Sequence, residues 1–128
     1  MTQTLDIDIP TAMWQTSNQR LHHMERARRT KHVRTLAGWT ARQLEPVTGT
    51  VHVHAHVSAP KRTRADVGNT YPTVKAVIDG LTDAGVWADD NDDHLIGPDM
   101  RRAAPTGTPG MYRIRLTLTP LEGEPHGA

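Results

Sequence analysis

The fold is decided by residues 61–93, which read KRTRADVGNTYPTVKAVIDGLTDAGVWADDNDD. Apolar residues recur in this stretch at helical spacing, at Val74, Val77, Ile78, Leu81 and Ala84. Pro72 suits the first turn of a helix, and Gly85 is a natural C-terminal cap. We therefore expect a core-facing helix over about residues 72–84, with a basic loop before it and a run of aspartates after it.

Alternation of apolar and polar residues predicts strands on both sides of this helix. The pattern is clear at residues 4–9, 48–57 and 112–119, as in strands with one buried face. Residues 95–96 predict a short strand, and residues 100–110, rich in Pro and Gly, predict a loop.

A second helix is expected over about residues 23–43. Its apolar stripe is narrow, and Gly38 lies inside it, although an interior Gly costs about 1 kcal/mol relative to Ala. The stripe comprises Val33, Leu36 and Ala37, with Met24, Ala27 and Leu44 as further candidates.

Together these elements predict an α+β fold, a small mixed β-sheet packed by two main helices. The length of 128 residues suits a single domain over residues 1–128. The chain has no Phe, and such a thin core leaves room for support from a partner, so we expect a homodimer. Residues 121–128 are expected to be a disordered tail.

Composition excludes several classes of protein. The absence of Cys rules out disulfides and thiolate metal sites. No apolar run approaches the length of a membrane helix, so we expect no membrane partner. The first ten residues carry acids and no basic region, unlike a signal peptide, which predicts a cytoplasmic location.

Charge is unevenly distributed although the net charge is only +1. Residues 20–42 contain seven Lys and Arg and a single acid, whereas residues 79–99 contain seven Asp and no Lys or Arg. Basic side chains suit a phosphodiester backbone, and carboxylates suit a divalent cation. Taken alone, each basic side chain is more typical of a solvated helix face. The set as a whole indicates phosphate contacts on one surface and a metal ion on another.

Three histidines share one face of the strand predicted at residues 48–57. His52, His54 and His56 could bind zinc through their imidazoles. The alternative is a polar sheet face without metal, near a partner subunit or nucleic acid.

The acidic residues flanking the central helix could support phosphodiester hydrolysis if the fold brings them together. Asp66 precedes the helix and Asp90 follows it, while Lys75 lies one turn inside. Mg²⁺ is typically held by one or two carboxylates plus a phosphate, and a Lys can stabilise charge at the reacting phosphate. The alternatives are an i,i+4 ion pair of Lys75 with Asp79 and a solvated acidic turn.

The chain resembles the RusA-type Holliday junction resolvases, small dimeric Mg²⁺-dependent endonucleases of bacteria and phages. The resemblance spans residues 4–119. It is carried by Ser17-Asn18-Gln19-Arg20, the basic run into Asp66 and Asn69, and then Lys75-Ala76-Val77-Ile78-Asp79-Gly80-Leu81, Asp83-Ala84-Gly85-Val86 and Asp89-Asp90.

The resemblance implies a role for each matching residue. Asp66 and Asp90 would bind Mg²⁺, with Mn²⁺ as the alternative ion, and Lys75 would assist at the phosphate. Branched or four-way junction DNA would contact Arg20, Lys61, Arg62, Arg64 and Asn69.

One position departs from the family pattern. The family commonly has Asp-x-Asp-Asn where this chain has Asp66-Val67-Gly68-Asn69, so one carboxylate is replaced by Gly68. Asp79, Asp89 or water would then supply the remaining ligand. The alternative function is a catalytically weakened dimer of the same fold that binds junction DNA.

Overall fold

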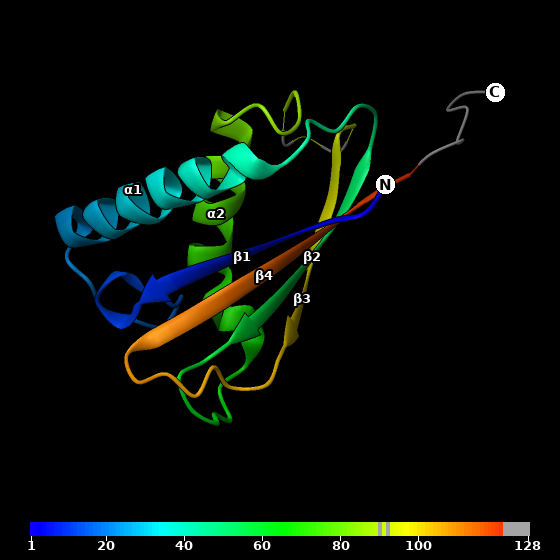
Figure 1. Cartoon of the computed structure of the whole chain (residues 1–128). Coiled ribbons are helices and arrows are strands. Elements are labelled where there is room, and N and C mark those ends of the chain that lie inside the picture. The colour runs from blue at the N-terminus through cyan, green and yellow to red at the C-terminus, as the bar shows by residue number, and fades with distance from the viewer. Residues whose placement is uncertain (90, 92, 122–128) are drawn as a thin grey trace.

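The computed structural model describes residues 1–89, 91 and 93–121, which form an α+β fold (Figure 1). This confirms the predicted mixed sheet with two main helices. The strands are β1 (Gln3–Pro10), β2 (Val51–Ser58), β3 (Leu95–Arg102) and β4 (Met111–Pro120), and the helices are α1 (His23–Thr40) and α2 (Tyr71–Asp83). Short 3-10 turns lie at η1 (Thr11–Met13), η2 (Ala41–Gln43) and η3 (Val67–Thr70).

The strand order is β1-β4-β2-β3. β4 is antiparallel to both of its neighbours, whereas β2 and β3 are parallel and are connected through α2. Val51 at the start of β2 pairs with Leu95, and Val57 near its end pairs with Arg102. The loop that enters α2 and the loop that leaves it therefore lie at opposite ends of the sheet (Figure 1).

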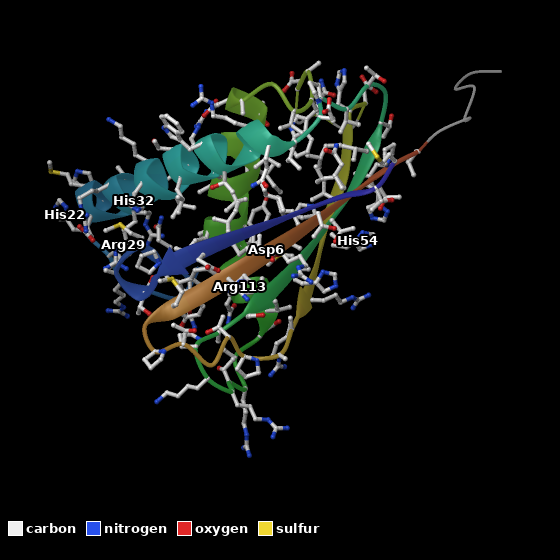
Figure 2. All side chains as sticks on the ribbon, in the orientation of Figure 1. Asp6, His22, Arg29, His32, His54 and Arg113 are labelled. Atoms are coloured by element: carbon white, nitrogen blue, oxygen red, sulfur yellow. The ribbon has the colours of Figure 1, made fainter. Side chains whose placement is uncertain are left out.

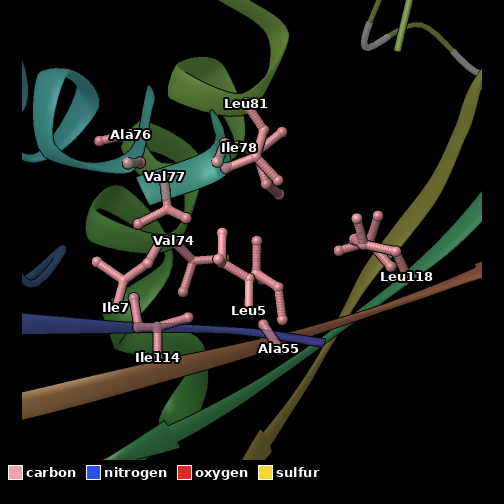
Figure 3. Packing of buried hydrophobic residues seen from close by; sticks show 14 of the residues in the cluster. Leu5, Ile7, Ala55, Val74, Ala76, Val77, Ile78, Leu81, Ile114 and Leu118 are labelled. Carbon is pink, nitrogen blue, oxygen red and sulfur yellow. The ribbon is translucent and has the colours of Figure 1, made fainter. Parts of the chain in front are cut away.

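The core fills the space between the helices and one face of the sheet. Alternate residues of the strands are buried, as in the buried-exposed pattern of β2, and they form one cluster with the apolar face of α2 (Figure 3). The α2 contribution consists of Val74, Ala76, Val77, Ile78 and Leu81. The apolar spacing that predicted this helix therefore matches its buried face.

The two helices approach each other closely at a glycine. A Cβ atom built on Gly80 would lie 2.4 Å from the carbonyl oxygen of Arg34 and 2.8 Å from the Cβ of Ala37. Gly38 faces this contact from α1, 3.3 Å from the Gly80 oxygen when given a Cβ. Glycine is unfavourable inside a helix, but Gly38 lies where the backbones of the two helices come close together.

Some sequence expectations need correction. β3 continues to Arg102 instead of ending at residue 96, so residues 100–102 are strand and not loop. α1 ends at Thr40 and is followed by a 3-10 turn. Met24 is 68% exposed and does not join the core. The predicted tail lies outside the described residues beyond Leu121.

The second face of the sheet is polar. Asp6 and Asp8 of β1 pair with Arg115 and Arg113 of β4, each through a 2.7 Å hydrogen bond. Figure 2 shows Asp6 on β1, Arg113 on β4 and His54 on β2. None of the described helices is both long and apolar enough to cross a membrane.

Candidate nucleic-acid interface

A pocket of about 530 Å³ lies where β2 and β3 end and the loop into α2 begins. Its rim carries the cationic side chains of Lys61, Arg62 and Arg102. Asp66 is the acidic residue that lines it within the described part of the chain. Cations around a single carboxylate suit a phosphodiester together with a divalent ion.

Aromatic side chains contribute to the wall of the pocket. Trp14 and Tyr112 stack with ring centroids 4.0 Å apart and planes 8° from parallel, and both line the pocket. Trp14 is buried. Arg29 donates a 2.8 Å hydrogen bond to the Trp14 carbonyl oxygen and is itself paired with Glu25. This wall is therefore anchored to α1.

Asp66 is the N-cap of η3. Its Oδ1 accepts a 3.0 Å hydrogen bond from the N–H of Gly68, so the short turn fixes the carboxylate at the pocket. A Cβ built on Gly68 would lie 3.5 Å from that same oxygen, which is ordinary van der Waals contact. The position where the family commonly has a second Asp therefore lies directly beside Asp66.

Two of the segments that carry the family resemblance, residues 17–20 and the loop from Asp66 to Asn69, are adjacent in the fold. The N–H of Ser17 bonds to the carbonyl oxygen of Asn69, which brings residues 17–20 next to the loop bearing Asp66. Arg20 and Arg64 are exposed. Of the expected DNA-contacting residues, Lys61 and Arg62 line the pocket, and Asn69 is bonded to Ser17, three residues before Arg20.

Lys75 lies on α2 and pairs with Asp79. Its Nζ is 2.8 Å from the Asp79 Oδ1. Neither residue lines the pocket. The ion pair considered as the alternative for Lys75 is therefore present, and a role at the phosphate stays a prediction for this residue.

Asp66 and Asp89 are not brought together within one chain. The thirteen-residue helix α2 separates them and spans roughly 20 Å at 1.5 Å per residue. After α2 the chain is tied to the start of β2, because the Val51 N–H bonds to the His94 oxygen, whereas the pocket lies beside Val57 at the end of β2. The expectation that Asp66 shares a cation with Asp89 is corrected accordingly.

The remaining acidic candidates do not complete the site. Asp79 is held by Lys75, and Asp90 lies outside the described residues. Within the part of the chain that the structure describes, the cluster of side chains able to hold a metal comprises His52, His54 and Asp99. His56 does not belong to this group, so the three-histidine arrangement is replaced by two histidines and an aspartate.

Three pocket residues were missed by sequence reasoning. Arg102 was placed in a loop, and Trp14 and Tyr112 were not considered as part of a site. A basic residue just before a Pro/Gly-rich segment was a usable signal for Arg102, but no local signal pairs Trp14 with a residue 98 positions away.

Comparison of the chain with protein-family profiles gave no match, and comparison with curated proteins gave none either. The likeness to RusA-type resolvases therefore rests on the quoted motifs.

Proposed function

We propose that this protein is a Mg²⁺-dependent endonuclease that hydrolyses phosphodiester bonds in branched DNA, such as four-way junctions. The observation that carries the proposal is the position of Asp66 in a pocket rimmed by Lys61, Arg62 and Arg102. The motif likeness to junction resolvases gives the substrate class.

The basic rim accounts for substrate binding. Each Lys or Arg that neutralises a phosphate releases condensed counterions, which favours binding. An Arg can also engage a phosphate through two parallel hydrogen bonds. Lys61, Arg62 and Arg102 would thus hold the backbone of the DNA against the carboxylate of Asp66.

Asp66 fits a role as ligand to Mg²⁺, because this ion keeps several waters and needs only one or two carboxylates when a substrate phosphate is present. When bound, Mg²⁺ activates water and neutralises charge that develops on phosphorus. The hydrogen bond from the Gly68 N–H orients the carboxylate of Asp66. The guanidinium of Arg62 would offset charge on the reacting phosphate.

The proposal includes a homodimer acting in the cytoplasm. Two subunits related by two-fold symmetry would place two pockets on opposing strands of a symmetric junction. Analytical ultracentrifugation of the DNA-free protein tests the homodimer separately. A protein that stays monomeric at all concentrations would contradict the homodimer.

The test is cleavage of a synthetic four-way junction by the wild type with Mg²⁺ and with a chelator. Cleavage that requires the metal supports the proposal. Asp90→Asn tests the residue that only the family likeness assigns. Equal cutting by this variant and the wild type would remove Asp90 from the mechanism.

A second candidate function is junction binding without cleavage, which Gly68 and the separation of Asp66 from Asp89 favour. In that case the wild type binds junctions but cuts none at any Mg²⁺ or Mn²⁺ concentration. Gly68→Asp would place a second carboxylate beside Asp66 and should generate cleavage. Gly68→Asn is the matched control, because it has similar size without the charge.

A further inference from the structure

Two histidines and an aspartate converge on the polar face of the sheet. His52 and His54 come from β2, and Asp99 comes from the neighbouring β3. The Nε2 atoms of His52 and His54 lie 2.5 and 3.8 Å from the Asp99 Oδ2. The two imidazole centroids are 4.2 Å apart, so the three side chains surround one small volume.

An irregularity in the sheet creates this convergence. His52 pairs with Ile96, but His54 pairs with Asp99, so β3 carries one extra residue between these two rungs. Without the extra residue, Pro98 instead of Asp99 would pair with His54. Bulges of this kind re-aim side chains and recur next to functional sites.

Gly97 makes the irregularity possible. Its φ is +104°, and a Cβ at this position would lie 2.6 Å from the carbonyl oxygen of Val53. A residue with a side chain would be strained there. Gly97 therefore lets β3 fit the extra residue, and Asp99 reaches both histidines as a result.

We propose that His52, His54 and Asp99 bind one Zn²⁺ ion, with the remaining coordination position open to solvent. Imidazole nitrogen and carboxylate oxygen are ordinary zinc ligands at about 2.0–2.2 Å, and three protein ligands leave a fourth tetrahedral position. Bonds of that length separate tetrahedral ligand atoms by roughly 3.3 Å. The two distances to Asp99 bracket this value, and all three ligand atoms lie within 4.8 Å of one another, so small side-chain rotations would form the site.

Two described residues of β4 lie beside the triad. Thr117 of β4 lies opposite His54, and its side chain carries no charge that would repel a cation. The cation next along the face, Arg115, is held by Asp6. His56 differs, because its register partners are Arg101 and Arg115, and two cations on either side disfavour metal binding there.

The site is distinct from the proposed DNA interface. His52 lies near the start of β2, and the pocket begins at Val57 near its end. The zinc proposal can therefore be contradicted while the proposal of junction cleavage stands, and the reverse also holds.

The test uses full-length protein without an affinity tag. Calorimetric titration with Zn²⁺, and Co²⁺ absorption as a reporter of tetrahedral coordination, should show one ion per chain. His52→Gln, His54→Gln and Asp99→Asn should each weaken binding about tenfold or more, since even the outer partners of metal ligands are worth that much.

His56→Gln is the matched control on the same strand face and should leave the affinity unchanged. Far-UV circular dichroism verifies that each variant is folded. A wild type that binds no Zn²⁺ would overturn the proposal. So would an affinity that survives Asp99→Asn and His54→Gln but is lost in His56→Gln.

Discussion

The backbone N–H of Ser17 donates a hydrogen bond of 2.8 Å to the carbonyl oxygen of Asn69. This bond joins the segment between η1 and α1 to the turn that enters α2. It brings Ser17 and Asn69, far apart in sequence, next to each other in the fold. The candidate interface is therefore assembled by the tertiary fold and not by one contiguous loop.

The basic rim of the pocket should determine the salt dependence of DNA binding. A double variant, Lys61→Ala with Arg62→Ala, should weaken junction binding and reduce the slope of log K against log salt by about 1.8, since each lost phosphate contact removes about 0.9. Fluorescence anisotropy across a salt series measures both effects.

The charge-matched control for that experiment is Lys31→Ala with Arg42→Ala, on α1 and η2. This variant should keep nearly the wild-type slope, because its side chains are not part of the pocket. A larger loss of slope in the control would place the DNA on α1 instead.

The close contact between the helices should make Gly80 intolerant of a side chain. Gly80→Ala forces a methyl group to within 2.4 Å of the Arg34 carbonyl oxygen. We expect a loss of about 1–3 kcal/mol in the free energy of unfolding, as for overpacked cores. Urea denaturation measures it.

Gly38→Ala is the comparison, because its methyl group would meet its nearest neighbour at 3.3 Å. Both glycines lie inside helices, so the gain of about 1 kcal/mol in helix propensity applies to both variants and the difference between them reports the crowding. The cost of Gly38→Ala should be smaller than that of Gly80→Ala, and equal costs would argue against the observed helix packing.

Glu25 should contribute to stability in a pH-dependent way. Hydrogen bonds from Arg28 and Arg29 lower the pKa of Glu25 from 4.5 to about 2. Because the folded-state pKa is the lower one, the contribution is present above about pH 4.5 and is lost as the pH falls towards 2. The stability difference between wild type and Glu25→Gln should therefore shrink across this window.

Unfolding free energies of both proteins at several pH values between 2 and 6 provide the check for Glu25, within the range where the unfolded carboxyl titrates. A difference that stays constant with pH would show that the two arginines do not act through the carboxylate. Exposed pairs are weak in general, so the trend with pH is the informative quantity.

The main elements could be predicted because their residues repeat with the correct period. Leu5, Ile7 and Ile9 alternate with acids, and the burial of β1 follows that alternation. The stripe on α2 has helical spacing and is buried as expected. β3 was underestimated because it is an edge strand whose second half carries Asp99, Arg101 and Arg102, and this part lacks the alternation of a half-buried strand.

The site was less predictable because it depends on where the ends of elements meet. Asp66 was identified from its neighbours in sequence, but its separation from Asp89 follows from the parallel pairing of β2 and β3. The triad with Asp99 depends on an extra residue in β3, which no pattern of hydrophobicity reveals. Motifs indicate the chemistry, whereas strand order and register decide which motifs can act together.

The central claim is tested most directly by the rate of junction cleavage with Mg²⁺ in Asp66→Asn. Asp66→Asn should cut at least about a hundredfold more slowly than the wild type, since even the hydrogen-bond partners of metal ligands are worth about 10–100-fold. Glu45→Gln removes the same charge from an exposed residue that does not line the pocket, and it should cut at the wild-type rate. Cleavage by Asp66→Asn at the rate of Glu45→Gln would contradict the account.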